Sequence, residues 1–127
     1  MADTVSVMVL DDEPIVCARL KDLLSKNGYE VEVYTESSEA LQRLKDKTFD
    51  VVVTDLKMRG PSGLDVLREV RAANGPTQVI MITAYGSMET ARAAECVGTF
   101  GFLPKPFKMN QILELVGKAA KRASKLK

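Results

Sequence analysis

The chain has 127 residues, of which 46% are hydrophobic and 28% charged, and its formal net charge is +1. This composition is typical of one globular domain, and the balanced charge gives no indication of nucleic-acid binding. No apolar run reaches the ~18 residues of a membrane-spanning helix, and the N-terminus lacks the segments of a secretory signal. We therefore expect a cytoplasmic protein with no membrane span and no direct nucleic-acid contact.

Histidine is absent from the sequence, which excludes Ser-His-Asp and Cys-His catalytic arrangements and histidine-ligated zinc. The two cysteines, Cys17 and Cys96, have no metal-type spacing and fall in helical patterns. Buried free thiols are the favoured interpretation, because a disulfide is disfavoured in a reducing cytoplasm. Any chemistry must therefore depend on carboxylates, lysine, threonine or the groups of a partner.

Short apolar segments alternate with helical patterns along the whole chain. Strands are expected at 5–10, 29–34, 49–55, 78–82 and 100–103, and helices at 14–27, 37–47, 64–73, 86–96 and 109–122. Three consecutive valines make 49–55 the best candidate for a central strand that is buried on both faces. This alternation, βα repeated five times, predicts an α/β fold, a doubly wound five-stranded parallel sheet with helices on both faces and right-handed crossovers.

The helix ends and faces follow from capping residues and apolar spacing. Asp12 or Glu13 is expected to cap the first helix, with Pro14 in its first turn. The inward face of that helix should carry Ile15, Val16, Leu20, Leu23 and Leu24. The last helix should direct inward Ile112, Leu113, Val116 and Ala120. We expect the domain to span 1–122, with 123–127 either a basic tail or a truncated linker.

Polar residues stand where four of the five expected strands end: Asp11 and Asp12, Asp55, Thr83, and Lys105. A doubly wound parallel sheet brings adjacent strand ends together at one edge, so these groups should converge. Three carboxylates in one cleft repel one another unless a cation offsets their charge, and Mg²⁺ prefers oxygen ligands of this kind. An ionised aspartate there could itself be a nucleophile that forms an aspartyl phosphate.

Each of these signals has a plainer explanation when taken alone. An Asp-Asp pair after a strand is most often a helix cap, and a strand-end threonine is usually a local hydrogen-bonding residue. A Lys-Pro pair is usually a turn, and Asp55 could cap a loop. Their joint occurrence at the ends of several strands of one sheet is much harder to explain by accident.

Taken together, these motifs resemble the receiver domain of two-component response regulators over essentially the whole chain. The resemblance rests on Asp11-Asp12, Asp55, Ile82-Thr83-Ala84 and Leu103-Pro104-Lys105-Pro106-Phe107. It implies the (βα)5 flavodoxin-like fold with the strand order 2-1-3-4-5. It also implies a phospho-acceptor at Asp55, and a phosphate-contacting hydroxyl and amine at Thr83 and Lys105. It also implies Mg²⁺ ligands at Asp11, Asp12, Asp55 and the backbone carbonyl of Lys57.

The resemblance further implies a conformational switch. The aromatic switch residue corresponds to Phe102, which has no hydroxyl and would act through ring packing alone; a plain core aromatic is the alternative. The Lys105-Pro106 bond is expected to be cis, as is typical of the family. Phosphorylation by a histidine kinase or a phosphotransfer protein would change the face made by the fourth helix, the fifth strand and the fifth helix, without turnover of a small substrate.

The segments 82–91 and 102–107 are similar to receivers of nitrogen-regulation-type activators of sigma-54 transcription. This similarity implies a covalently linked output domain beyond this chain, or a stand-alone receiver, and a phosphorylation-dependent homodimer is an open alternative. A haloacid-dehalogenase-type phosphatase is disfavoured because Lys57 stands where a second acid is needed. A flavodoxin-like cofactor binder is disfavoured because it would need a glycine- and hydroxyl-rich loop after the first strand, where this sequence is acidic. A phosphorylation-independent interaction module is disfavoured because it need not keep all five polar groups, and all five are present.

Overall fold

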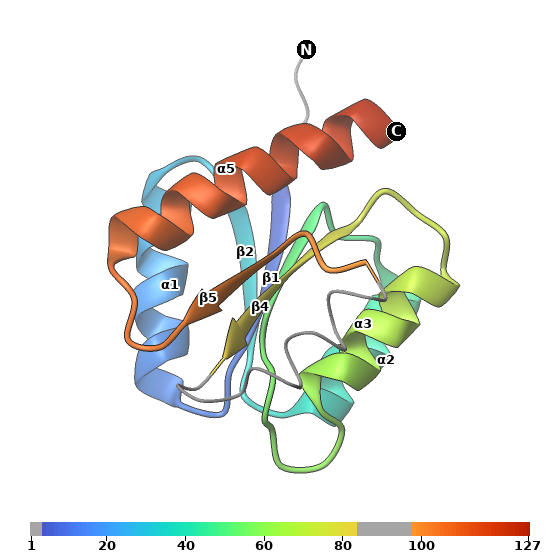
Figure 1. Ribbon diagram of the computed structural model, residues 1–127, viewed down its shortest axis with the longest axis horizontal. Coiled ribbons are helices and arrows are strands. Elements are labelled where there is room, and N and C mark those ends of the chain that lie inside the picture. Colours follow the sequence, from blue (N-terminus) through green and yellow to red (C-terminus); the bar gives the residue numbers. More distant parts are fainter. Residues whose placement is uncertain (1–3, 84–97) are drawn as a thin grey trace.

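A computed structural model describes residues 4–83 and 98–127 of the chain (Figure 1). The strands are β1 Ser6–Leu10, β2 Glu30–Tyr34, β3 Val51–Asp55, β4 Gln78–Thr83 and β5 Gly101–Pro104. All neighbouring pairs are parallel, and the order across the sheet is β2-β1-β3-β4-β5. The predicted doubly wound α/β fold and its strand order are confirmed.

The helices are α1 Pro14–Lys26, α2 Ser37–Asp46, α3 Gly63–Ala72 and α5 Met109–Leu126. Figure 1 shows α1 and α5 on one face of the sheet and α2 and α3 on the other. The helix expected at 86–96, together with Ala84 and Cys96, lies outside the described residues. In the part of the chain that the structure describes, no helix is long and apolar enough to cross a membrane.

The core consists of two apolar clusters, one on each face of the sheet. Side chains alternate along each strand, so Val7 and Val9 pack toward α1 and α5, whereas Met8 and Leu10 pack toward α2 and α3. Every residue of β3 is buried, because this central strand is covered on both faces. The valine run therefore serves both clusters and ends, at Asp55, on the carboxyl edge of the sheet.

The first helix differs from its sequence-based description at its start. Ile15 was expected to face inward, but it is 69% exposed, and the fully buried positions of α1 are Cys17, Leu20 and Leu24. Glu13 is the N-cap residue, yet its side chain makes no capping hydrogen bond. The preceding Asp11 carboxylate instead accepts the Glu13 backbone N–H at 2.9 Å. The prediction of a buried free thiol is confirmed for Cys17.

The last helix is longer than expected, since α5 continues past Arg122 to Leu126. Small residues extend its buried stripe, because Ala119 and Ala123 are fully buried alongside Ile112 and Val116. The expected inward position at Leu113 is only partly buried. The stripe reaches the amino edge of the sheet, where α5 ends.

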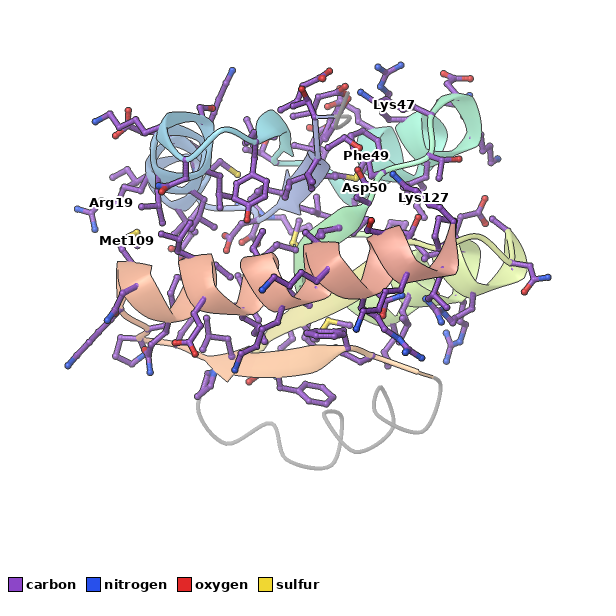
Figure 2. The ribbon with its side chains drawn as sticks, turned by 90° about the horizontal axis from the view of Figure 1, so that it is seen from above. Arg19, Lys47, Phe49, Asp50, Met109 and Lys127 are labelled. Carbon is purple, nitrogen blue, oxygen red and sulfur yellow. The ribbon has the colours of Figure 1, made fainter. Side chains whose placement is uncertain are left out.

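A second buried aspartate lies at that amino edge. Asp50 precedes β3 and is 7% exposed, and its carboxylate accepts the backbone N–H of Ser6 at 2.9 Å. The Lys127 ammonium lies 2.5 Å from the same carboxylate. Figure 2 shows Asp50 and Lys127 near the C-terminal end of α5, whereas Arg19 and Met109 lie at its other end. At the amino edge of the sheet, the carboxylate of Asp50 is therefore paired with groups of the fold itself.

Candidate functional site

The predicted polar residues meet at the carboxyl edge of the sheet. Asp11 follows β1 directly, and Asp55 and Thr83 are the last residues of β3 and β4. Carboxylate oxygens of Asp11, Asp12 and Asp55 all lie within 4.8 Å of one another. The parallel pairing of β1 with β3 aligns their ends, which is why acids 44 positions apart in the chain form one cluster.

Lys105 reaches into this cluster from the connection after β5. Its ammonium nitrogen lies 3.0 Å from an oxygen of Asp11 and 3.0 Å from an oxygen of Asp55. The Lys105 backbone N–H donates to the Thr83 carbonyl at 2.8 Å, which fixes the start of the connection against β4. The Lys105-Pro106 peptide bond is cis, as expected. One ammonium is thus shared by two buried carboxylates.

Burial and the neighbouring charges shift the pKa values of Asp55 and Lys105. The pKa of Asp55 lies above its usual value because burial disfavours the ionised form, and the charge of Asp11 adds to the shift. Interactions with Lys105 and the backbone N–H of Lys57 oppose that rise without cancelling it. Burial by itself would lower the pKa of Lys105, but its contacts with Asp11 and Asp55 raise it above the usual value. The ammonium therefore stays charged. Within residues 4–83 and 98–127, one ammonium serves a cluster of three carboxylates.

One oxygen of Asp11 shows this shortage directly. Asp11 is 0% exposed, and its Oδ1 accepts the Glu13 backbone N–H. Its Oδ2 has Lys105 as an ion-pair neighbour, but it accepts no hydrogen bond from any residue that the structure describes. A buried carboxylate oxygen with unused acceptor capacity, beside two further carboxylates, is a donor set suited to a hard divalent cation.

The segment that follows Asp55 is held close to the site by main-chain contacts. The Leu56 N–H donates to the Ile82 carbonyl and the Gly63 N–H to the Leu56 carbonyl, each at 2.9 Å. Ser62 and Asp65 form a reciprocal capping box at the start of α3. We call residues 56–62 the acceptor loop. Lys57 lies in this loop, and its side chain is exposed.

Gly63 is a structural residue of this site that the sequence analysis did not single out. A Cβ placed there would lie 2.5 Å from the Asp55 carbonyl oxygen and 2.8 Å from the Met81 sulfur. Only glycine allows α3 to begin this close to the end of β3. A glycine after turn residues at a helix start is a weak signal, and the close approach itself is a tertiary fact that the sequence does not reveal.

Thr83 ends β4 at the carboxyl edge of the sheet, and Phe102 lies in the neighbouring strand β5. Met81 of β4 is the register partner of Phe102 of β5, and Thr83 is two residues further along β4, on the same face. Thr83 is buried, whereas Phe102 is partly buried against the cluster on the α2 and α3 face. The structure thus brings together Asp11, Asp12, Asp55 and Lys105. Thr83 and Phe102 share the sheet face of Met81, whereas Asp55 is the register partner of Ile82.

A doubly wound sheet with acids and a lysine at its carboxyl edge defines the class of the domain. Residues 7–117 match the model of the response regulator receiver domain family. A crystal structure of a response regulator receiver domain protein from Clostridium thermocellum is 32% identical, with a TM-score of 0.90, and the match covers 97% of this chain and 99% of that one. The chain belongs to the response regulator receiver domain family, which serves two-component signalling.

Curated relatives support the same assignment. The transcriptional regulatory protein ZraR of Escherichia coli K12 is 32% identical over 117 residues, which are 92% of this chain and 26% of the relative. The response regulator protein PilR of Pseudomonas aeruginosa is 35% identical over 112 residues, which are 88% of this chain and 25% of the relative. The chain therefore spans about a quarter of the length of these relatives. The family assignment favours a receiver over the phosphatase and flavodoxin alternatives.

Proposed function

We propose that the chain accepts a phosphoryl group on Asp55 from a phosphohistidine of a histidine kinase or phosphotransfer protein. The observation that carries this proposal is the shared ammonium of Lys105, 3.0 Å from both Asp11 and Asp55 in a buried acidic cluster. A carboxylate that is held beside a fixed cation can approach an anionic phosphoryl group with less repulsion.

Mg²⁺ is the cofactor that the donor set suits. The carboxylates of Asp11, Asp12 and Asp55 would hold it, together with the backbone carbonyl of Lys57. When bound, the ion supplies positive charge that offsets the phosphoryl oxygens. The buried Oδ2 of Asp11, which accepts no hydrogen bond among the described residues, supports this assignment.

The chemical step needs few groups of the protein. An Asp55 carboxylate oxygen forms the new P–O bond while the P–N bond of the donor breaks, and the electron pair stays on the imidazole nitrogen, which takes up a proton. Lys105 contacts Asp55 already, and in this proposal it would pair with the transferred group. In this proposal the chain catalyses only its own phosphorylation and slow dephosphorylation, so it is a signalling protein and no turnover enzyme.

The phosphorylated state would be transmitted through Thr83 and Phe102. Both lie on the sheet face of Met81, and Thr83 is nearer than Phe102 to the carboxyl edge that Asp55 ends. A phosphoryl group that draws the Thr83 hydroxyl toward the acidic cluster would leave space for the Phe102 ring. The bound group need only favour one of two packing states that differ by a few kcal/mol. The face that includes β5 and α5 would then change its binding preference.

The output is proposed to be transcriptional, in the cytoplasm. ZraR bears the name of a transcriptional regulatory protein and is about four times as long as the region matched here. A linked output domain of the sigma-54 activator kind fits that length difference. The receiver itself would make no direct nucleic-acid contact, and its phosphorylated form could pair with a second copy through the changed face.

The central assignment is tested by phosphoryl uptake. The protein is treated with Mg²⁺ and a labelled small-molecule phosphodonor, and bound label is measured by intact mass and autoradiography. Wild type should take up one phosphoryl group, and Asp55→Asn should lose uptake at least about 100-fold, because an amide cannot replace the nucleophile. Asp46→Asn, an exposed acid at the end of α2, is the matched control and should behave as wild type. Uptake by Asp55→Asn at the wild-type rate would refute the proposal.

A further inference from the structure

A serine of α2 contacts the acceptor loop from across a cleft. Ser37 is the first residue of α2 and is 1% exposed. Its hydroxyl donates to the backbone carbonyl of Arg59 at 3.2 Å. The cleft has a volume of about 410 Å³ and is lined on one side by the start of α2, on the other by 59–61, and by Asp12 of the acidic cluster.

Among the residues that the structure describes, the other hydrogen bonds of the acceptor loop lie at its two ends. The Gly63 N–H holds its base to Leu56, and the capping box holds Ser62 to α3. The contact of Ser37 differs from these because it reaches the middle of the loop and comes from a separate helix. The loop turns immediately afterwards, at Gly60, with a φ of 76°. Ser37 therefore fixes the point from which the chain reverses toward α3.

That point is two residues from a main-chain segment that touches the site. The backbone N–H of Lys57 interacts with the Asp55 carboxylate, and it contributes to the balance that sets the pKa of Asp55. The Lys57 carbonyl belongs to the same short stretch that Ser37 anchors at Arg59. Only the torsions of Met58 and Arg59 separate the Arg59 carbonyl from the Lys57 carbonyl, so a tie at Arg59 restricts the positions open to the Lys57 main chain. A brace on Arg59 is thus a brace on the main chain beside Asp55.

We propose that Ser37 is a positioning residue that holds the acceptor loop, and with it the Lys57 main chain, in the geometry that binds Mg²⁺. This inference rests on the proposed function, since it presumes that the acidic cluster binds the ion. It assigns to α2 a part in the site that none of the strand-end residues would suggest. Groups that orient a metal ligand contribute to the affinity for the metal, although they do not touch the ion themselves.

The test compares Ser37→Ala with wild type and with Ser38→Ala. Ser38 is the adjacent, exposed residue that lines the same cleft, so Ser38→Ala controls for serine loss at the start of α2. Mg²⁺ affinity is measured by calorimetric titration, amide hydrogen exchange is measured at Lys57 and Arg59, and unfolding by urea is measured without Mg²⁺. Ser37→Ala should fold, because the freed Arg59 carbonyl belongs to an exposed residue and can bond to water.

We expect Ser37→Ala to bind Mg²⁺ about three- to tenfold more weakly, with faster exchange at Lys57 and Arg59, and Ser38→Ala to match wild type. A merely structural serine would lower stability and leave both readings unchanged. If Ser37→Ala keeps the wild-type Mg²⁺ affinity and loop exchange, the role of Ser37 is refuted while the proposed function stands. Asp12→Asn distinguishes the other failure: if wild type binds Mg²⁺ no better than Asp12→Asn, the proposed function fails and the inference fails with it.

Discussion

Two aspartates stand at the two ends of one strand, and the protein treats them in opposite ways. Asp50 precedes β3 at the amino edge, Asp55 ends it at the carboxyl edge, and each is 7% exposed. The pKa of Asp50 lies below its usual value: burial acts to raise it, but Lys127 and Ser6 outweigh that effect. The pKa of Asp55 lies above it, because burial and Asp11 outweigh Lys105.

The difference teaches that burial alone does not decide what a buried carboxylate is for. Asp50 has a backbone N–H, a hydroxyl and an ammonium around it, so its charge is satisfied within the fold. Asp55 shares one ammonium with a second buried acid and so is left with charge to offset. The first arrangement is paired within the fold, whereas the second leaves acceptor capacity among the described residues that suits a cation from outside the chain.

The largest expected change in stability comes from the close approach behind Asp55. Gly63→Ala should reduce the free energy of unfolding by about 2–4 kcal/mol, because its Cβ would meet the Asp55 carbonyl at 2.5 Å. Urea unfolding measures the change. Gly75→Ala is the matched control, since a Cβ there meets no atom within 4 Å. An equal loss in the two variants would show that the close packing of the carboxyl edge has no special cost.

An intermediate effect separates the two aspartates themselves. Asp50→Asn should reduce the free energy of unfolding by about 1–3 kcal/mol, since a charged acceptor of several hydrogen bonds is lost. Asp55→Asn, measured without Mg²⁺, should be unchanged or stabilised by up to about 1 kcal/mol, because one of the clustered negative charges is removed. Urea unfolding of both variants checks the order. A loss in Asp55→Asn as large as in Asp50→Asn would contradict the comparison.

The smallest effect is a pH dependence of opposite sign at the two edges. The pKa of Asp50 is lower in the folded protein than in the unfolded chain, where it lies near 4. Asp50 therefore stabilises the fold above about pH 4, and this contribution is lost as the pH falls through the folded-state pKa. The pKa of Asp55 is higher in the folded, Mg²⁺-free protein than in the unfolded chain. The contribution of Asp55 to stability is therefore most favourable below the unfolded-state pKa, and it is lost as the pH rises through the folded-state pKa.

Unfolding of wild type and of the two asparagine variants from pH 7 to pH 3 measures both contributions. The stability gap between wild type and Asp50→Asn should shrink toward pH 3. Between wild type and Asp55→Asn, wild type should gain relative stability over the same range. Parallel curves for all three proteins would mean that the two carboxylates are equivalent.

The candidate site could be predicted from sequence because of where polar residues interrupt apolar strands. Asp55 and Thr83 end buried runs, and parallel strands leave no other place for such groups to meet than one sheet edge. The fold followed from the same alternation of strands and helices. This reasoning needs only the order of the elements, so it survives small errors in their bounds.

Features that depend on contacts between elements were not predictable in this way. Ile15 fits the helical spacing of α1, yet it faces solvent, because spacing alone does not fix where a buried stripe begins. Ala119 and Ala123 continue the buried stripe of α5, but alanines carry little apolar signal. Asp50 fell within the strand expected at 49–55, and its ion-pair partner Lys127 is far away in the sequence.

The contact between Asp50 and Ser6 has a consequence for alignment across the sheet. Val7 is paired with Val51, so Ser6 and Asp50 stand together where β1 and β3 begin. A slip of one residue between these strands would turn their valines to the wrong faces and carry Asp11 away from Asp55. The Ser6 N–H and hydroxyl reach the Asp50 carboxylate only when the strands are in step. The contact at the amino edge therefore stabilises the β1–β3 register that brings Asp11 and Asp55 together at the carboxyl edge.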